Sequence, residues 1–318
     1  MNSTRHVISV SGGKDSTATL LLAMQRVLPE TLIPIFCDTG NEHDITYQYL
    51  DDIERYLGIH IRRLKADFTK EIAAKRRFIA RDQRTGRDRK GRKLRWSNKA
   101  KRRALAVLHA SGNPFLDLCM WKGRFPSRMA QFCTEELKRN MAVEFQLDLI
   151  DQGFSVISWQ GVRRDESANR RNAKKMERSG PKLWAFRPLV DWTAQQTVDF
   201  VRDQGCPLNL LYTMGCNRVG CMPCINVSKS ELASVSYRFA EEIDRIEEWE
   251  FLVSQCSKRG YSTMMADAHD AKDRRKIFAD LNIRAQVRWA TGNNGSLSLF
   301  DDGELSVPVC SSAYGLCE

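Results

Sequence analysis

Six consecutive residues near the N-terminus combine glycine, hydroxyl and lysine groups: Ser11-Gly12-Gly13-Lys14-Asp15-Ser16. They lie between an apolar run at 7–10 and another at 17–22, which predict a buried strand followed by a helix. Glycine permits a close approach of the backbone to a ligand, and the start of a helix has N–H groups without partners inside the helix. With the cation of Lys14 beside them, these groups predict a site for phosphate or sulfate.

A plain glycine turn capped by Asp15 or Ser16 is the simplest alternative, and the spacing is not that of a Walker A loop. The six residues resemble the SGGxDS pyrophosphate loop (PP-loop) of the adenine-nucleotide alpha-hydrolase-like enzymes. These include ATP pyrophosphatases, tRNA thiolation enzymes and the sulfonucleotide (PAPS/APS) reductases. The resemblance implies that residues 11–16 hold the phosphates of ATP with Mg²⁺, and that Lys14 and Asp15 are catalytic.

Three cysteines lie close together in the second half of the chain, in the order Cys216, Cys221 and Cys224. Thiolates at this spacing can converge on one metal centre. A zinc site wants a fourth nitrogen or sulfur ligand, and no histidine is near in sequence. Three close cysteines and a distant one suit a [4Fe–4S] cluster, whereas Cys133 alone would ordinarily be a buried thiol.

The segment 220–224, Gly-Cys-Met-Pro-Cys, resembles the second half of the cluster motif of APS-type reductases. Phe132-Cys133-Thr134, with Lys138 after it, resembles the first half, with Phe132 in place of one cysteine. Cys216 is additional and could restore a fourth ligand. This arrangement is similar to the iron–sulfur ATP pyrophosphatases of DNA phosphorothioation systems (DndC/SspD type), and it implies cluster ligands at Cys133, Cys216, Cys221 and Cys224.

Two further positions are candidates for the nucleotide site. Asp38 is the last residue of an apolar run at 32–38 that predicts a parallel strand, and the carboxyl end of such a strand faces the ligand crevice. Capping of the next turn is the alternative role for Asp38. Arg163 and Arg164 follow a predicted strand at 155–162, and two guanidinium groups there could hold a phosphate or the activated substrate. The segments 161–167 and 188–192 also resemble stretches of the reductase superfamily.

The C-terminal tail decides between reductase and pyrophosphatase. The reductases resemble one another in a C-terminal Glu-Cys-Gly-x-His, whose cysteine attacks the sulfonucleotide. This chain has Cys310 and Cys317 near its end but lacks that motif. The two thiols could carry a persulfide, bind metal or have no role, and reductive cleavage of APS or PAPS is not the first expectation.

Charge is unevenly distributed. The chain has a net charge of +11, and residues 70–103 contain sixteen Lys and Arg against three acids, so the remainder is close to neutral. This basic arm predicts a polyanionic partner, nucleic acid first. Residues 83–95 have no hydrophobic period and are expected to form a mobile loop, with Trp96 as its hydrophobic anchor.

The elements that must position these groups alternate between strand and helix patterns. They predict an α/β fold with a mostly parallel, doubly wound sheet, Rossmann-like, followed by a helical C-terminal extension. Helices are expected at about 44–57, 127–146, 228–259 and 271–287. Residues 1–226 would form the nucleotide and iron–sulfur domain with the basic arm 70–103 inserted, and 227–318 the extension. The absence of a long apolar stretch or a leader predicts no membrane segment and a cytoplasmic protein.

The leading hypothesis is an ATP pyrophosphatase that adenylylates a nucleic-acid target for sulfur incorporation. The phosphorothioation resemblance implies DNA as the target, a cysteine desulfurase as the sulfur donor, and other phosphorothioation subunits as partners. One alternative is a sulfonucleotide reductase or sulfotransferase. Another is a nucleic-acid-binding subunit in which nucleotide and cluster are structural.

Overall fold

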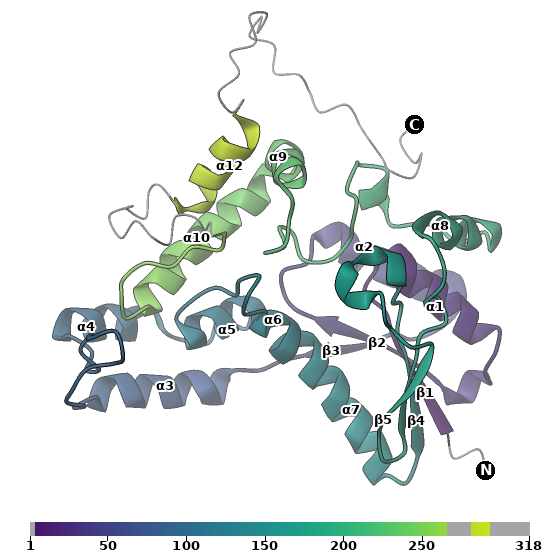
Figure 1. The fold of residues 1–318 in the computed structure, drawn as a ribbon, viewed down its shortest axis with the longest axis horizontal. Coiled ribbons are helices and arrows are strands. Elements are labelled where there is room, and N and C mark those ends of the chain that lie inside the picture. Colours follow the sequence, from purple (N-terminus) through teal and green to yellow (C-terminus); the bar gives the residue numbers. More distant parts are fainter. Residues whose placement is uncertain (1–3, 266–280, 293–318) are drawn as a thin grey trace, which may run out of the picture. The chain divides into compact units, whose positions relative to one another are not determined.

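A computed structural model describes residues 4–265 and 281–292 of the chain (Figure 1). Within these ranges the chain forms two compact units. Unit 1 comprises residues 4–65 and 136–222, and unit 2 comprises 66–135 and the described residues from 223 onward. The predicted boundary after residue 226 stays a prediction about domain extent. By its contacts, the segment 66–135 belongs with the C-terminal helices.

Unit 1 is built on a six-stranded sheet in the order β3-β2-β1-β4-β6-β5. Its strands are β1 (Thr4–Ser9), β2 (Leu32–Asp38), β3 (Arg62–Lys65), β4 (Ser155–Trp159), β5 (Met176–Gly180) and β6 (Leu183–Phe186). All neighbours pair in parallel except β5, which is antiparallel to β6. The chain runs outward from β1 to β3 and then returns to place β4 on the other side of β1. The carboxyl ends of β1 and β4 therefore form a switch point, the usual ligand position in such sheets.

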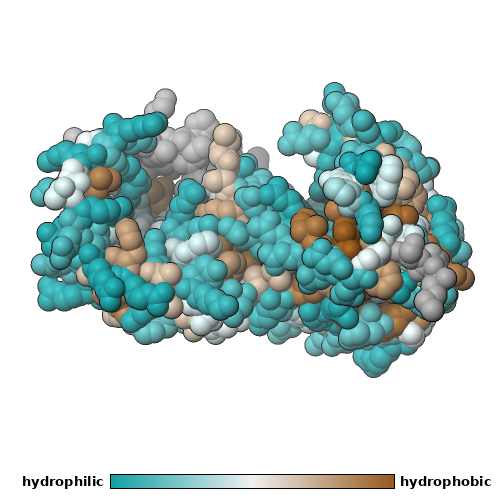
Figure 2. Space-filling view, turned by 90° about the horizontal axis from the view of Figure 1, so that it is seen from below, coloured by the Kyte–Doolittle hydropathy of each residue, from teal (hydrophilic) through white to brown (hydrophobic). Residues whose placement is uncertain are grey.

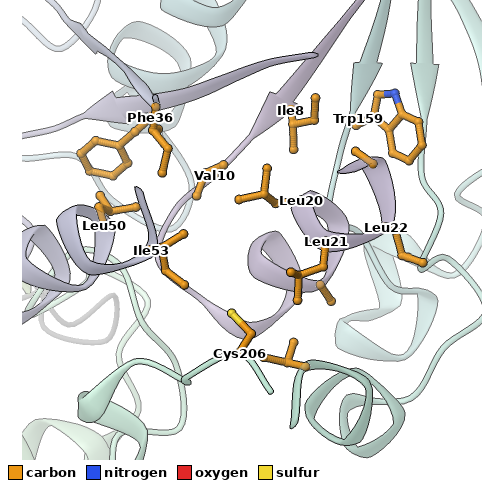
Figure 3. Close-up of a cluster of buried hydrophobic side chains, with 14 of the residues drawn as sticks. Ile8, Val10, Leu20, Leu21, Leu22, Phe36, Leu50, Ile53, Trp159 and Cys206 are labelled. Atoms are coloured by element: carbon orange, nitrogen blue, oxygen red, sulfur yellow. The ribbon is translucent and has the colours of Figure 1, made fainter. Parts of the chain in front are cut away.

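Four helices belong to unit 1: α1 (Lys14–Met24), α2 (Asp44–Leu57), α7 (Asn140–Asp151) and α8 (Ala194–Asp203). Helices α1 and α7 pack against the sheet, and α8 packs against α1. The larger core joins β1 and β2 with α1, α2 and the end of α8, and it includes the fully buried Ile8, Leu20 and Leu50 (Figure 3). A smaller core packs Val7, Ile35 and Val156 against α7. Two apolar clusters on one parallel sheet confirm the predicted α/β architecture.

Unit 2 is helical. Its helices are α3 (Thr69–Arg81), α4 (Asn98–Val107), α5 (Pro114–Lys122), α6 (Phe132–Thr134), α9 (Lys229–Arg238), α10 (Ala240–Cys256) and α12 (Ile283–Thr291). At its centre Phe115 stacks on Trp249 with ring centroids 5.7 Å apart, which ties α5 to α10. Short 3-10 turns at Pro29–Thr31, Arg164–Glu166, Ala168–Arg170 and Leu210–Tyr212 complete the regular structure of the described chain, with a π turn at Glu135–Arg139. No helix in the described ranges is long and apolar enough to cross a membrane.

Two predicted helices differ from the structure, and a third lies largely outside the described residues. The helix expected at 127–146 begins only at Phe132 and passes through the π turn before α7. The long helix expected at 228–259 is interrupted at Phe239, whose backbone leaves the helical region at φ −135° and ψ 60°. Much of the helix expected at 271–287, together with Cys310 and Cys317, lies outside the described residues.

The loop expected to be mobile, residues 83–95, is instead held by hydrogen bonds. The buried Asp82 carboxylate accepts from the backbone and side chain of Arg84 and from the backbone of Trp96. Asp88 accepts from the backbone and guanidinium of Arg92. Trp96 is buried, as the anchor role predicted. Two acids inside a basic run act here as acceptors that fix the loop.

Candidate functional site

The loop 11–16 joins the carboxyl end of β1 to the start of α1 and is closed by its own serines. The Ser16 hydroxyl accepts from the Ser11 amide at 3.0 Å and contacts the Ser11 hydroxyl at 3.2 Å, and it donates to the Gly13 carbonyl at 2.8 Å. Ser16 thus holds the loop in shape. The first turn of α1 then directs its amide groups toward the loop, and this arrangement favours the binding of an anion there.

Gly12 needs to be glycine for two reasons. Its backbone lies in the left-handed region at φ +76°, and a Cβ there would come within 2.9 Å of the Thr46 methyl group on α2. The Gly12 carbonyl accepts a hydrogen bond from the fully buried Asn209 side chain at 3.3 Å. The loop is therefore fixed by residues that lie almost 200 positions further along the chain.

Lys14 is held over the loop by Tyr212. The Tyr212 hydroxyl accepts from the Lys14 amide at 3.0 Å, and the Lys14 ammonium lies 5.4 Å from the centroid of the Tyr212 ring. The Lys14 side chain is only 6% exposed. Burial of an ammonium costs free energy unless an anion or aromatic ring compensates it, so this position suits a cation that meets a phosphate.

Asp15 and Arg163 connect the loop to the carboxyl end of β4. The Arg163 Nε donates to the Asp15 carboxylate at 2.5 Å, and another nitrogen of the same guanidinium contacts Asp165. These carboxylates raise the pKa of Arg163 against the opposing effect of its burial. Close packing of the two segments requires Gly161, because a Cβ on it would lie 2.8 Å from the Asp15 carbonyl oxygen.

Arg164 takes a different direction from its neighbour. Its guanidinium pairs with Asp191 and donates to the Ala173 carbonyl at 3.0 Å, and its side chain is 42% exposed. The structure thus places Arg163 against the loop and connects Arg164 to the segments at 173 and 191.

Asp38 ends β2 beside a buried acid that the sequence analysis missed. One Asp38 oxygen accepts from the Gly40 amide at 2.9 Å and from the Tyr47 hydroxyl at 2.7 Å. The Glu42 carboxylate, 3% exposed, accepts from the Thr39 amide at 3.2 Å and from the Thr39 hydroxyl at 2.7 Å. Burial, then the charges of Glu42 and Asp38, raise the pKa of Tyr47, so its hydroxyl remains a donor.

Cys221 lies against this acidic turn. Its sulfur is 3.8 Å from a Glu42 oxygen and 3.5 Å from the Thr39 hydroxyl, and residues 42 and 221 form an antiparallel bridge. The Met222 amide donates to the Asn41 carbonyl at 2.7 Å. One of the predicted cluster cysteines is therefore positioned at the carboxyl end of β2, the strand next to the one that leads into loop 11–16.

The four predicted cluster ligands are divided between the units. Cys216 and Cys221 belong to unit 1, whereas Cys133 and Cys224 belong to unit 2. In the described part of the chain, no group of three or more His, Cys, Asp or Glu side chains is arranged to hold a metal ion. The [4Fe–4S] cluster thus stays a prediction from the resemblance.

Sequence reasoning missed several of the residues that shape this site: Thr39, Glu42, Tyr47, Asn209 and Tyr212. Thr39, Glu42 and Tyr47 are polar residues that follow the strand ending at Asp38. Asn209 and Tyr212 had no local signal, because their partners are distant in sequence.

Comparison with known proteins places these features in context. A family model described as phosphoadenosine phosphosulfate reductase domain matches residues 5–227. An uncharacterised 37.8 kDa protein of Escherichia phage 186 is 42% identical over 99% of this chain and 97% of its own length. An adenosine 5'-phosphosulfate reductase of Rhizobium tropici is 36% identical over 22% of this chain and 39% of its own length.

Among solved structures, a phosphoadenylyl-sulfate (PAPS) reductase from Candida auris, in a phosphate complex, is similar in fold. It aligns with 70% of this chain and 82% of its own, at a TM-score of 0.41 and 14% identity.

Proposed function

Because the chain belongs to the phosphoadenosine phosphosulfate reductase domain family, whose members bind adenine nucleotides, we propose that it is an ATP pyrophosphatase that adenylylates a nucleic-acid target. The observation that carries the proposal is the closed loop 11–16 at the switch point of the sheet. Its shape is set by Asn209 and Tyr212, and Arg163 ties Asp15 of the loop to the carboxyl end of β4.

In the proposed reaction an oxygen of the target attacks the α-phosphorus of ATP. A new oxygen–phosphorus bond forms, the bond to the β-phosphate breaks, and pyrophosphate leaves with the electron pair. Loop amides and Lys14 would stabilise the charge that develops on the departing phosphates, because they are fixed before the reaction begins. Asp38 would contact the nucleoside from the end of β2.

Arg163 has a positioning role in this scheme. Its Nε and one terminal nitrogen already bond the Asp15 and Asp165 carboxylates, so it orders the loop around Asp15. Arg164 would contact the activated substrate only by exchanging its pairing with Asp191. In a second reaction the outer sulfur of a persulfide, supplied by a cysteine desulfurase, would attack the adenylylated centre and AMP would leave. A thiol reductant would then break the sulfur–sulfur bond and leave the sulfur on the target.

Metal requirements differ between the two predicted cofactors. Mg²⁺ is commonly bound by one or two carboxylates and the substrate phosphates, so a three-residue cage is not needed. Asp15 lies in the loop and Asp38 ends the neighbouring strand β2, so these are the candidate carboxylates, and Mg²⁺ would neutralise the pyrophosphate when bound. For the [4Fe–4S] cluster, Cys133, Cys216, Cys221 and Cys224 are the proposed ligands, and no step above depends on it.

The test is pyrophosphate release from ATP by anaerobically purified protein, with and without DNA, with iron and labile sulfide measured on the same sample. Pyrophosphate formation supports the proposal, and about four irons per chain would support the cluster separately. Absence of pyrophosphate under all conditions would reject adenylylation, whatever the iron content.

A sulfonucleotide reductase is the second candidate, favoured by the family and by the stretch shared with the Rhizobium tropici enzyme. Sulfite released from APS or PAPS with a thiol reductant, and no reaction with ATP, would establish it. Loss of that sulfite in Cys310→Ser or Cys317→Ser would identify the reacting thiol. Nucleic-acid binding without either reaction would favour a binding subunit.

A further inference from the structure

Helix α3 carries a basic stripe on its exposed face. Lys70, Arg77 and Arg81 are separated by seven and four residues, so they lie along one side of the helix. Ile72 and Ile79 on the other side are buried in unit 2. The rise of an α-helix places the three cations about 10 and about 6 Å apart along the axis. The face of unit 2 seen at the left of Figure 2 is largely hydrophilic, with isolated hydrophobic residues.

The two arginines of the stripe have no carboxylate partner in the described chain. No ion pair joins Arg77 or Arg81 to an acid there, whereas Arg84, Arg92, Arg163 and Arg164 each have at least one. Charges without a protein counterion attract an external polyanion, and guanidinium groups bind phosphate with two parallel hydrogen bonds. Arg77 and Arg81 are therefore suited to an external anion.

A hollow of about 320 Å³ lies at the C-terminal end of the stripe, lined by Arg77, Phe78, Arg81, Asp82, Gln83 and Arg84. Phe78 is 43% exposed, although it is a large apolar residue in a basic surface. The Arg84 guanidinium lies 4.6 Å from the centroid of its ring. The volume is at the lower end of the range for small-molecule sites, so it fits about one nucleotide.

The loop beyond α3, which borders the hollow, is anchored by hydrogen bonds. Asp82 holds Arg84 with a hydrogen bond of 2.8 Å, and the charge-assisted bonds keep the pKa of Asp82 well below its usual range. The Lys258 ammonium donates to the Leu94 carbonyl at 2.7 Å and secures the far side of the loop. The single acid in the hollow is already neutralised by Arg84, which leaves the surface cationic.

We propose that α3 binds a single strand of nucleic acid, with phosphates on Lys70, Arg77 and Arg81 and one unstacked base in the hollow beside Phe78 and Arg84. Bases stack on exposed aromatic rings and on guanidinium planes, and a cationic groove follows the backbone. Bases inside an intact duplex cannot reach such a ring. This inference rests on the proposed function only in naming where its nucleic-acid target binds.

The experiment is fluorescence anisotropy of a labelled 20-nucleotide single strand with the full chain, without ATP, across a series of salt concentrations. Arg77→Gln/Arg81→Gln is compared with Lys99→Gln/Arg102→Gln, which removes the same charge from exposed positions on α4. Phe78→Ala is compared with Phe251→Ala, an exposed phenylalanine on α10 of the same unit. Circular dichroism and melting curves establish that each variant is folded.

We expect the α3 double variant to reduce the slope of log K against log salt by about 1.4, since each phosphate contact on a single strand contributes about 0.7. Phe78→Ala should weaken binding about 5- to 100-fold without changing the slope, as for loss of one stacked base. Each control, Lys99→Gln/Arg102→Gln and Phe251→Ala, should change strand binding less than the α3 variant with which it is compared. Equal losses in both double variants, equal effects of Phe78→Ala and Phe251→Ala, or equally tight binding of poly-glutamate would overturn the proposal.

Two separate assays test the strand site on α3 and the proposed ATP pyrophosphatase reaction independently. Strand binding is measured without nucleotide, and pyrophosphate release from ATP is measured both with and without DNA. A protein that releases pyrophosphate but shows no α3 dependence of binding would reject only the strand site. A protein that binds the strand through α3 but never releases pyrophosphate would reject only the proposed reaction.

Discussion

Arg163 and Asp15 are 148 residues apart in the chain, and yet the Arg163 Nε donates to the Asp15 carboxylate at 2.5 Å. The Arg163 side chain is 5% exposed and that of Asp15 20%, so water screens the pair only in part. This ion pair joins the carboxyl ends of β1 and β4, the two strands that flank the switch point of the sheet. It therefore links the predicted phosphate loop to the second half of unit 1.

Arg163→Met should destabilise unit 1. It leaves the Asp15 and Asp165 carboxylates without their guanidinium, and breaking a buried pair typically costs 3–5 kcal/mol. Because Asp15 is partly exposed and also lies 4.0 Å from Lys14, we expect a loss of about 2–3 kcal/mol in the free energy of unfolding. Urea denaturation measures it. The Asp15→Asn/Arg163→Met double variant should recover part of the loss, and strict additivity of the two single changes would contradict a direct interaction.

Gly161→Ala tests the packing between the same segments. The added methyl group would lie 2.8 Å from the Asp15 carbonyl oxygen and 3.1 Å from the Ser16 amide, both backbone atoms. Overpacking of this kind costs about 1–3 kcal/mol. Displacement of the loop by even about 1 Å could lower pyrophosphate release about 100-fold.

Gly180→Ala is the matched control, because the nearest atom to its Cβ is the Leu183 Cβ at 3.8 Å, an ordinary contact. It should leave pyrophosphate release unchanged. If Gly161→Ala is as active and as stable as the control, the loop does not need its present position.

The sequence predicted most of unit 1 because its signals are local. An apolar run marks a buried strand wherever the chain places it, and the helix expected at 44–57 is α2. The strands β5 and β6 were missed. For β5 the reason is that Met176–Gly180 is mostly polar and occupies the sheet edge. An edge strand needs little hydrophobicity, so its pattern is weak.

The loop at 83–95 shows where prediction from local sequence fails. Its composition indicates mobility, whereas its order depends on where Asp82 and Asp88 find donors in the folded chain. The same holds for the site, where loop 11–16 was found from its own residues. Tyr212 and Asn209 were not, because a hydrogen bond across almost 200 residues leaves no periodic trace.

Tyr212→Phe should weaken ATP binding more than it affects the fold. It removes the hydroxyl that accepts the Lys14 amide at 3.0 Å but keeps the ring beside the Lys14 ammonium. Loss of one acceptor for a buried amide costs about 1–3 kcal/mol. Part of that cost should appear as an ATP affinity about 5-fold lower, measured by isothermal titration calorimetry.

Tyr56→Phe provides the comparison, because the Tyr56 hydroxyl is likewise bonded to the backbone, donating to the Gly205 carbonyl, but the residue is 54% exposed. Its ATP affinity should equal that of the unchanged protein. An unaltered affinity in Tyr212→Phe as well would show that the hydroxyl does not shape the loop.

Glu250 should make the stability of unit 2 depend on pH. Its carboxyl group is fully buried on α10 and accepts from the Met264 and Ile283 amides, each at 2.8 Å. Burial outweighs these two donors and raises the pKa of Glu250 from 4.5 to about 7. Between these values the native state binds more protons than the unfolded chain, so its stability should fall as pH rises from 4.5 to 7. The expected loss is on the order of 2 kcal/mol.

Melting curves at pH 5 and pH 7.5 measure this effect for the unchanged protein, Glu250→Gln and the exposed-site control Glu248→Gln. The glutamine cannot ionise, so Glu250→Gln should lose most of the difference between the two pH values. It should also be less stable at pH 5, because an amide oxygen accepts from one of the two backbone donors while its NH₂ group faces the other. Glu248→Gln should keep the full pH dependence. A pH dependence retained in Glu250→Gln would assign the titration to another group.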